Sequence, residues 1–448
     1  MKFVADFHIH SKYSRATSPL MDLENLDRWA KIKGINVLGT GDFTHPEWFE
    51  NIKKELEPAE PGLFRFTLHP SKTTPTKLSV ASGLSLMGEG LRSSESPTRF
   101  VLTSEISCIY SKKGKVRKIH IIIFAPSIDA VEKINLKLSQ IGNLKADGRP
   151  ILGLDAKELA KIVLDIDENC LVVPAHIWTP WFSVFGSKSG FNSLEECFDE
   201  YTKYIYAVET GLSSDPAMNW RLSQLDKITL ISNSDAHSLP KIGREANIFD
   251  TELSYPGIAD ALKTKRPEGC PNKFLHTVEF FPEEGKYHYD GHRLCNLSLS
   301  PAESKKYNNI CPRCAKPLVI GVLNRVEELA DRPEGFLPEN AVPFKSLIPL
   351  NEVIAESIGV SVLSKEVSKH YNNLIKNLGS ELQILLESTE KEIGEKSLPE
   401  IANGVIRMRE GKVSIEPGYD GVYGKIKIFS GKNDQDSKKN SAAQKTLF

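Results

Sequence analysis

Histidine and carboxylate side chains recur along this sequence beside short apolar runs, and most of them come directly after such a run. The runs are rich in the β-branched and aromatic residues typical of strands. The polar residues are His8, His10, Asp42, His45, Glu105, His120, His176, Asp235 and His237. Imidazole and carboxylate groups are the usual protein ligands of catalytic metals. Because metals held close together commonly hydrolyse phosphate esters, the pattern predicts a metal-dependent phosphoesterase.

The spacing of these residues strengthens the prediction. A single histidine on a strand is usually an ordinary core or surface residue. In His8-Ile-His10, however, residues i and i+2 of a strand point to the same side, so two imidazoles can converge on one ion. Asp235-Ala-His237 repeats this spacing. We therefore expect the two pairs to take part in one metal centre.

A second set of ligand residues lies further along the chain. Cys311-Pro-Arg-Cys314 has the two-residue gap of a zinc knuckle, and Cys295 supplies a third thiolate. His292 lies three residues before Cys295 and is the best fourth ligand, with His288 as the competitor. The sequence predicts a closed structural zinc site in a ribbon too small to fold without metal.

Length and composition indicate a globular chain of two or three domains. The 448 residues are 40% hydrophobic and 26% charged, and the net charge of −1 argues neither for nor against nucleic acid. The first residues meet charge too early for a signal peptide, and no apolar run is long enough to span a membrane. We expect a cytoplasmic protein without a membrane partner, in which Cys108, Cys170 and Cys197 are buried thiols.

Up to about residue 265, apolar strand-like runs alternate with amphipathic segments, as in folds with parallel strands and outer helices. Active sites of such folds gather at the carboxyl ends of the strands, where most of the ligand residues fall. We predict helices at 23–33, 156–165 and 216–225, and strands at 36–39, 171–175 and 229–233. Residues 58–98 interrupt the alternation, as an active-site flap or a surface excursion.

The remaining chain divides into three further parts. Residues 266–325 hold the predicted zinc module, and residues 326–429 form a mainly helical domain. In that domain we expect helices at 342–358 and 366–387 and a glycine-rich β-like segment at 404–429. Residues 430–448 are polar and are expected to be a disordered tail.

Several motifs resemble those of the PHP (polymerase and histidinol phosphatase) superfamily, and of its endonuclease Q family in particular. The resemblance covers roughly residues 1–428. The motifs are Gly39-Thr-Gly-Asp-Phe-Thr-His-Pro-Glu-Trp48, Pro174-Ala-His-Ile-Trp-Thr-Pro-Trp181, Gly285-Lys-Tyr-His-Tyr-Asp-Gly-His292, Cys311-Pro-Arg-Cys314, Arg325-Val-Glu-Glu-Leu-Ala-Asp-Arg332 and Gly418-Tyr-Asp-Gly-Val-Tyr-Gly424. The resemblance implies an α/β fold: a distorted (β/α)7 PHP barrel over residues 1–265, followed by the zinc module and the helical domain.

The resemblance also implies how the ligands are shared among three metals. The first metal takes His8, His10, Glu105 and Asp235, and the second shares Glu105 and takes His120 and His176. The third takes His237 with ligands from the first two motifs. There the sequence departs from the family pattern, because Ser14-Arg15 replaces Ser-Asp, and in Asp42-Phe43 the histidine is displaced to His45.

The activity implied by the resemblance is a DNA-repair endonuclease. Such enzymes cut the phosphodiester on the 5′ side of a deaminated base (hypoxanthine, uracil or xanthine) or an abasic site. His10, Glu105 and Asp235 would be catalytic, with zinc, Mg²⁺ or Mn²⁺ at the centre. The alternatives are a PHP phosphomonoesterase acting on a small metabolite and a catalytically silent DNA-binding or adaptor protein.

Two further stretches suit contacts with DNA. An enzyme that reads a damaged base must extrude it, which requires aromatic or apolar side chains at the site. The segment after His176 supplies Trp178, Trp181, Phe182 and Phe185, although a hydrophobic loop under the barrel would have the same composition. Arg15 is either a phosphate contact or an ordinary surface arginine, and the basic stretch 112–118 is either a phosphate contact or a solvated hairpin turn.

The last five residues, Gln444-Lys-Thr-Leu-Phe448, resemble the start of an archaeal sliding-clamp-binding motif. The chain stops before the motif's second aromatic residue. A disordered tether with an apolar end is suited to recruitment. Gln444, Leu447 and Phe448 are therefore candidate contacts with a DNA sliding clamp.

Overall fold

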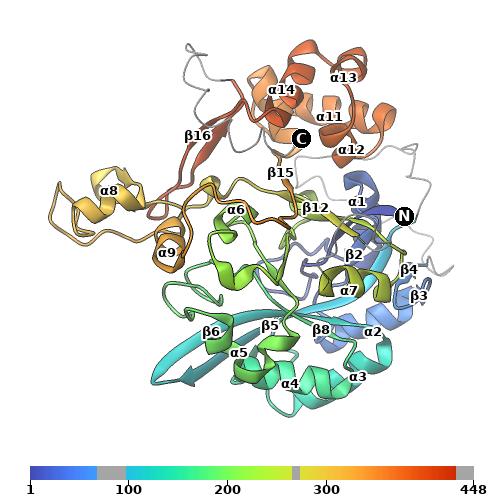
Figure 1. Ribbon diagram of the computed structural model, residues 1–448. Helices are drawn as coiled ribbons and strands as arrows, with labels where there is room; N and C mark the ends of the chain where they lie inside the picture. The colour runs from blue at the N-terminus through green and yellow to red at the C-terminus, as the bar shows by residue number, and fades with distance from the viewer. Residues whose placement is uncertain (68–96, 265–272, 430–448) are drawn as a thin grey trace.

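The computed structural model describes residues 1–67, 97–264 and 273–429. A barrel forms its larger part (Figure 1). A small module with helices α8 (Pro301–Lys306) and α9 (Val322–Leu329) extends to one side, and a group of helices covers one end. The predicted flap (largely 68–96) and the predicted tail lie outside the described residues. Among the described residues, no helix is long and apolar enough to cross a bilayer.

Seven strands follow one another around the barrel in the part of the chain that the structure describes. Neighbours pair in parallel between β1 and β2, β2 and β5, and β9 and β10, and antiparallel on both sides of β6. The Ile177 N–H donates to the Glu209 carbonyl (3.1 Å), and a parallel bridge joins Ile9 to Ala236, which closes the ring. The strands are β1 (Lys2–Asp6), β2 (Val37–Gly39), β5 (Arg99–Lys112), β6 (Lys115–Ala125), β8 (Leu171–Pro174), β9 (Ala207–Glu209) and β10 (Thr229–Ile231). The predicted distorted α/β barrel is confirmed.

The barrel sheet continues beyond this ring. On one side β11 pairs antiparallel with β1 and β12 pairs antiparallel with β11. Strand β15 pairs in parallel with β12 and brings the C-terminal region against the barrel. Short strands add to the other side. These strands are β11 (Ala246–Asp250), β12 (Lys273–Glu279), β15 (Phe344–Ser346), β3 (Leu56–Pro58), β4 (Phe64–Phe66) and β7 (Ile151–Leu152).

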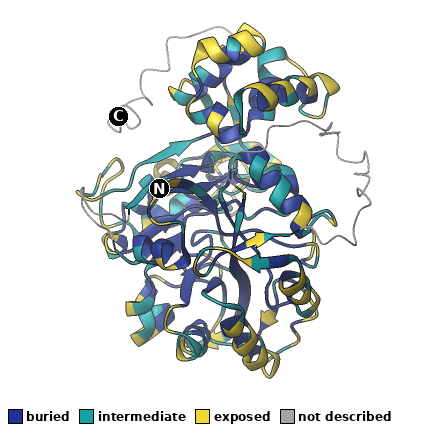
Figure 2. Ribbon diagram, turned by 90° about the vertical axis from the view of Figure 1, so that its right-hand side faces the viewer, coloured by how far each residue is buried: buried dark blue, intermediate teal, exposed yellow. Residues whose placement is uncertain are grey.

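Helices pack around the barrel with their apolar faces buried (Figure 2). The predicted helix 23–33 is confirmed as α1, where the Asp22 side chain accepts from the Asn25 N–H and Gly34 (φ 88°) ends the helix. The predicted cap Asp155 likewise begins α4. The helices are α1 (Leu23–Lys33), α2 (Pro46–Glu55), α3 (Ile128–Ser139), α4 (Ala156–Ile166), α5 (Leu194–Phe198), α6 (Pro216–Asn219) and α7 (Tyr255–Lys263). The thiols predicted to be buried are buried.

The C-terminal region is helical, as predicted, but its boundaries differ from the expectation. The predicted helix 366–387 is two helices, because Gly379 (φ 104°) leaves the helical conformation and Ser380 caps the second one. Both halves bury their apolar side chains in the same core, which explains the continuous periodicity. The helices are α10 (Leu350–Ile358), α11 (Lys365–Leu378), α12 (Glu381–Leu386), α13 (Glu390–Lys396) and α14 (Pro399–Arg409).

Three other predicted boundaries were wrong. The helix expected at 342–358 begins only at Leu350, since Pro343 and Pro349 bracket strand β15. The helix expected at 216–225 is the four-residue α6 followed by a turn of 3₁₀-helix. The β-like segment begins after α14 and consists of β16 (Ser414–Glu416) and β17 (Lys425–Lys427).

A buried ion pair links the barrel to the C-terminal helices. Lys33 at the end of α1 lies 2.6 Å from Glu381 at the start of α12, and both side chains are almost fully buried. Glu381 also accepts from the Tyr371 hydroxyl (2.5 Å) and the Leu350 N–H (3.1 Å). Because a buried charge is costly without partners, this contact fixes how α12 sits on the barrel.

The small module rests on the barrel through arginines of α9 and the turn after it. Arg325 is buried and donates to the carbonyls of Phe185 and Phe191, both at 3.1 Å. Arg332 makes two hydrogen bonds to the carboxylate of Asp226 (2.7 and 2.6 Å). Strands β13 (Asp290–His292) and β14 (Leu297–Leu299) form the hairpin of the module.

Candidate metal centre

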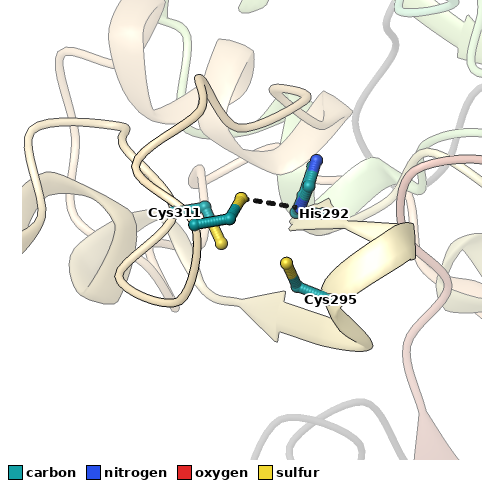
Figure 3. A group of neighbouring side chains, drawn as sticks. His292, Cys295 and Cys311 are labelled. Carbon is teal, nitrogen blue, oxygen red and sulfur yellow. Dashed lines mark hydrogen bonds between the residues drawn. The ribbon is translucent and has the colours of Figure 1, made fainter.

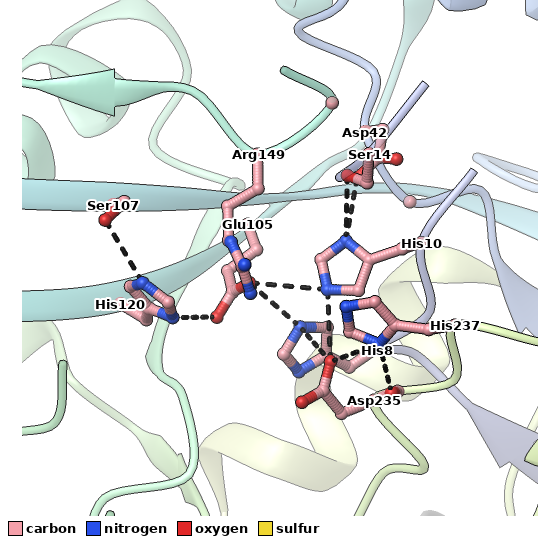
Figure 4. A network of polar contacts seen from close by, with 12 residues as sticks. His8, His10, Ser14, Asp42, Glu105, Ser107, His120, Arg149, Asp235 and His237 are labelled. Carbon is pink, nitrogen blue, oxygen red and sulfur yellow. Dashed lines mark hydrogen bonds and ion pairs between the residues drawn. The ribbon is translucent and has the colours of Figure 1, made fainter. Parts of the chain in front are cut away.

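Two clusters of metal-ligand side chains lie at one end of the barrel, and the ligand atoms of each lie within 4.8 Å of one another. One contains His8, His10 and Asp235, which follow β1 and β10. The other contains Glu105 and His120, on β5 and β6, with His176 after β8. Figure 4 shows most of these side chains pointing toward a common centre. The barrel therefore brings together residues that are far apart in the sequence.

Glu105 faces both clusters. Its Oε2 lies 3.4 Å from His10 Nε2 and 3.5 Å from His8 Nε2. Its Oε1 lies 2.7 Å from His120 Nδ1 and 3.0 Å from His176 Nε2. A carboxylate in this position can bridge two metal ions held by the two sets of imidazoles.

Each imidazole of the two clusters has its other nitrogen on a second partner. His8 Nδ1 contacts Glu209 and His10 Nδ1 contacts Asp42, both at 3.0 Å. His120 Nε2 lies 3.1 Å from Ser107 Oγ and His176 Nδ1 lies 3.2 Å from Thr179 Oγ1. Such partners fix the tautomer and orientation of metal-binding histidines and leave the inward nitrogen free for a metal.

Strand register accounts for one of these contacts. Ser107 pairs directly with His120 across β5 and β6, and Glu105 lies two residues from Ser107 on the same face of β5. The antiparallel hairpin therefore places the bridging carboxylate, the imidazole and the hydroxyl that orients it side by side.

Three residues of the centre have backbone conformations that are uncommon outside glycine. Asp42 (φ 50°), His176 (φ 28°) and Asp235 (φ 46°) all have positive φ. Gly211 packs against His176 so closely that a Cβ there would lie 2.4 Å from the His176 Cβ. Such conformations cost free energy and persist where the surrounding structure enforces them, as at binding sites.

The electrostatics of the site suit cations. Burial alone would lower the pKa of His8, but Glu209 and Glu105 raise that pKa well above its usual value. Burial would raise the pKa of Glu105, yet His120 and His8 hold it well below the usual range. The buried His8 Nε2 has no hydrogen-bond partner among the described residues. This unpartnered nitrogen beside ionised carboxylates fits a metal ligand.

The residues predicted for a third metal lie beside this centre but do not form a third cluster among the described residues. The Asp42 carboxylate contacts His10 Nδ1 and accepts from the Ser11 N–H and hydroxyl. His45 lies at the start of α2 and stacks on Tyr13, with ring centroids 4.4 Å apart. The ring of His237 lies 4.4 Å from that of His10, and its Nδ1 lies 2.9 Å from the Asp235 carbonyl.

The four residues predicted to bind zinc lie together in the small module. The ligand atoms of His292, Cys295, Cys311 and Cys314 lie within 4.8 Å of one another. Figure 3 shows His292, Cys295 and Cys311 facing one another, and His292 Nδ1 lies 3.5 Å from Cys314 Sγ. His288 is not part of this cluster; burial lowers its pKa to about 4. The structure thus favours His292 over its competitor.

Comparisons with known proteins agree with this architecture. Residues 349–412 match the family model of the MJ0043 C-terminal domain. Protein MJ0043 of Methanocaldococcus jannaschii is 35% identical over 251 residues, which are 56% of this chain and 31% of that relative. YqxK of Bacillus subtilis is 30% identical over 440 residues, covering 95% of this chain and 99% of YqxK.

Two crystal structures resemble nearly the whole chain. The lesion-specific endonuclease PfuEndoQ from Pyrococcus furiosus has a TM-score of 0.80 and 28% identity, covering 98% of this chain and 99% of that one. The chain belongs to the endonuclease Q family. A complex of endonuclease Q with a 27-mer duplex substrate, which carries an abasic lesion at the active site, has a TM-score of 0.78 and 29% identity. It covers 96% of this chain and 99% of that one.

Two residues of this endonuclease Q centre were missed from the sequence. Glu209 accepts from His8, from the His176 N–H (2.8 Å) and from Asn233 (2.9 Å). Arg149 donates from Nη1 to Glu105 Oε2 (3.1 Å). Glu209 ends a short apolar run, Ala207-Val208, and could have been found by the same rule as the histidines. Arg149 precedes its strand and has no such signal.

The predicted base-contacting residues fall into two groups. Trp178 is 1% exposed and donates from its indole to Asn219 (2.8 Å), and Phe185 is buried against it. These two rings belong to the core, so the prediction that they contact a nucleotide is not supported. Trp181 is 46% exposed, and the ring of Phe182 lies 4.6 Å from that of His120.

The predicted phosphate contacts lie at the surface. Arg15 is 85% exposed, and its Nε lies 4.0 Å from Asp147. The basic stretch is the turn of the β5–β6 hairpin, with Lys113 (φ 52°) and Gly114 (φ 73°) at its tip. Lys113 and Lys115 are exposed, whereas Lys112 contacts Asp199.

Proposed function

We propose that this chain is a metal-dependent DNA-repair endonuclease that hydrolyses the phosphodiester 5′ of a deaminated base or an abasic site. The observation that carries the proposal is the Glu105 carboxylate shared by two imidazole clusters. The whole-length likeness to a lesion-specific endonuclease supports it, as does the likeness to an endonuclease bound to a duplex with an abasic lesion. Hypoxanthine, uracil and xanthine are the proposed deaminated bases.

The residues that would hold the metals follow from the two clusters. His8, His10 and Asp235 would bind one ion, His120 and His176 would bind the second, and Glu105 would bridge them. Bound metals supply an activated water and neutralise negative charge on the phosphate, which is the chemistry that phosphodiester hydrolysis requires. Imidazole ligands suit zinc, whereas carboxylate ligands suit Mg²⁺ and Mn²⁺, and this set contains both kinds of ligand.

The protein side chains have their own parts in this proposal. Glu209 and Asp42 hold His8 and His10 in the orientation in which both Nε2 atoms face the centre. Asp42 and Glu209 are fully buried, so water does not compete for their hydrogen bonds to the two histidines. The site is therefore preorganised before substrate binds, which reduces the cost of reaching the transition state.

Trp181 and Phe182 are the proposed contacts with the extruded nucleotide. Phe182 lies against His120, so a base stacked on its ring would place the adjoining phosphate near the metal centre. Arg15 and the hairpin tip, with Lys113 and Lys115, would contact the phosphates of the duplex around it. His292, Cys295, Cys311 and Cys314 would bind a structural zinc ion.

A sliding clamp remains a proposed partner through Gln444, Leu447 and Phe448. These residues lie outside the described part of the chain, so the proposal rests on their sequence alone. Deleting residues 440–448 should weaken binding to an archaeal clamp without changing the nicking of free duplex. Unchanged clamp affinity would contradict this partner.

The function is tested by comparing two substrate classes with the same metal-loaded protein. Duplexes with a single deoxyinosine, uracil or abasic site should be nicked, and an undamaged duplex should not. Release of phosphate from a panel of small phosphomonoesters should be negligible beside this nicking. The opposite result, phosphate release without nicking, would favour the phosphomonoesterase.

A further inference from the structure

Arg149 places a guanidinium group at the rim of the metal centre, in contact with Glu105. We propose that Arg149 contacts the phosphodiester that is cleaved and that it is a catalytic residue of this chain. The proposal deepens the proposed function and rests on it. It is argued from the placement of the side chain, from the loop that holds it and from the charges around it.

The guanidinium lies at the rim of the centre rather than within the core. Nη1 donates to Glu105 Oε2 (3.1 Å), the oxygen that also faces His8 and His10. The side chain is 27% exposed, and its other guanidinium nitrogens have no partner within the described residues. Figure 4 shows it reaching over Glu105 toward the histidines. Donors beyond Nη1 are therefore free to bind a ligand that enters the centre.

The loop before Arg149 is held so closely that the side chain has little choice of direction. Gly148 donates to the Tyr13 carbonyl (3.0 Å), and a Cβ on it would lie 2.3 Å from Asp42 Oδ2 and 2.4 Å from Ser14 Oγ. The Arg149 N–H donates to Asp147 (3.1 Å).

On the other side of Arg149, the chain enters strand β7, which pairs with β5. The segment is therefore fixed both to the His-x-His loop and to the strand of Glu105.

The charges at the centre leave room for an anion. In the described part of the chain, four carboxylates contact the ligand histidines: Asp42, Glu105, Glu209 and Asp235. Two divalent metals together with Arg149 would carry more positive charge than these carboxylates carry negative charge. A guanidinium that only oriented Glu105 would compete with the metals for that carboxylate. A phosphate group can contact the metals and also accept from the free N–H groups, because two of its oxygens match the spacing of the guanidinium donors.

Arg15 offers a useful contrast. It is the arginine that the sequence indicated for a phosphate contact, but its side chain is 85% exposed and directed to Asp147. A contact from that position would reach the duplex outside the centre. Arg149 is the arginine with a donor inside it.

The test is a thermodynamic cycle in which Arg149 and the charge of the scissile phosphate are changed separately and together. Duplexes with an abasic site would carry either the ordinary phosphodiester or a neutral methylphosphonate 5′ of the lesion. Their binding would be measured by fluorescence anisotropy with metal-loaded Asp235→Asn protein, which is expected not to cleave, with and without Arg149→Gln. The loss of affinity on neutralising the phosphate should be about tenfold smaller in the Arg149→Gln protein, as expected when a charge-assisted hydrogen bond is missing.

An equal loss of affinity in both proteins would overturn the proposal. Metal content would be measured on every variant: an unchanged loss together with reduced metal would make Arg149 a positioning residue of Glu105. Arg65→Gln is the matched control, because Arg65 is exposed and paired with Glu57 on the β3–β4 hairpin. Nicking of the abasic duplex by the protein with Asp235 unchanged would be followed in parallel. No nicking at all would contradict the proposed function itself, whereas nicking without the coupling would contradict only the role of Arg149.

Discussion

His8 Nδ1 lies 3.0 Å from Glu209 Oε1, a contact that connects the segment after β1 to the end of β9. Glu209 is fully buried and also accepts from the His176 N–H, so one carboxylate fixes residues of both metal-ligand clusters. The orientation of the centre therefore depends on a residue that is not itself in either cluster.

Replacing Glu209 by glutamine should weaken metal binding without unfolding the protein. The amide keeps the shape of the side chain but cannot accept as strongly from His8 Nδ1, and such changes typically cost about 10- to 100-fold in metal affinity. Calorimetric titration of the metal-free protein with Zn²⁺ or Mn²⁺ would measure the loss. Glu400→Gln, at an exposed helical position, should leave the affinity unchanged, and equal affinities in the two variants would contradict this role.

Alanine at Phe182 or Trp181 should reduce the cleavage of lesion-containing duplex while the free energy of unfolding changes little, because both rings are partly exposed. Alanine at Trp178 should instead destabilise the protein by about 3–5 kcal/mol, as is typical for removal of a large buried side chain. Urea unfolding and nicking rates of the three variants would be compared. Full nicking activity in both Phe182→Ala and Trp181→Ala would contradict the proposed base contact.

Serine at Cys311 should remove zinc from the small module and lower its thermal stability. The thiolate is the stronger zinc ligand, and metal binding supplies folding free energy in modules of this size. Zinc content after dialysis and the melting temperature would be measured for this variant. Cys170→Ala removes a buried thiol of the barrel and should leave the zinc content unchanged. Zinc fully retained by Cys311→Ser would contradict the assignment.

The stability of the barrel should fall as the pH rises from about 5 to 8. Burial raises the pKa of Glu279 to about 8, so the folded state keeps a proton that the unfolded state has already released. The hydroxyls of Ser232 and Thr210 lie beside Glu279 and also within reach of backbone carbonyls. Each hydroxyl can therefore donate to a carbonyl and accept from Glu279 when Glu279 carries its proton. The stabilisation is fully present below the unfolded pKa and is lost as the pH passes through the folded one.

Glutamine at Glu279 should remove much of this pH dependence, which amounts to a few kcal/mol on the order-of-magnitude scale of such shifts. Urea unfolding of both proteins at several pH values would measure it. The remaining dependence of stability on pH would come from other buried acids, such as Glu245. Burial and the neighbouring Glu279 also raise the pKa of Glu245. Parallel profiles for wild type and variant would show that Glu279 is ionised in the fold.

The ligand side chains could be found from the sequence because each lies on or just after an apolar strand, where a polar residue is unexpected. His8, Glu105 and Asp235 are of this kind, and the structure gathers them. Glu209 obeys the same rule but stands alone in its segment. Arg149 could not be found, because its position depends on the packing of Gly148 against the His-x-His loop, which no periodicity reveals.

The limits of the fold prediction have similar causes. Helix α1 has a cap at each end and was predicted to the residue. The break at Gly379 was missed because α11 and α12 bury their apolar faces in one core. Gly404, expected in a β-like segment, lies within α14, where a Cβ would come within 2.5 Å of Ser357 Oγ on α10. Close helix packing, rather than a turn, favours a small residue there.

The central claim is tested most directly by mapping the cut on a labelled duplex with a single deoxyinosine, uracil or abasic site. The protein would be supplied with Mg²⁺, Mn²⁺ or Zn²⁺, beside an undamaged duplex and the Asp235→Asn variant. We predict a metal-dependent nick immediately 5′ of the lesion, absent from the undamaged duplex and lost in the variant. A nick at other positions, or one that persists without metal or in Asp235→Asn, would contradict the account.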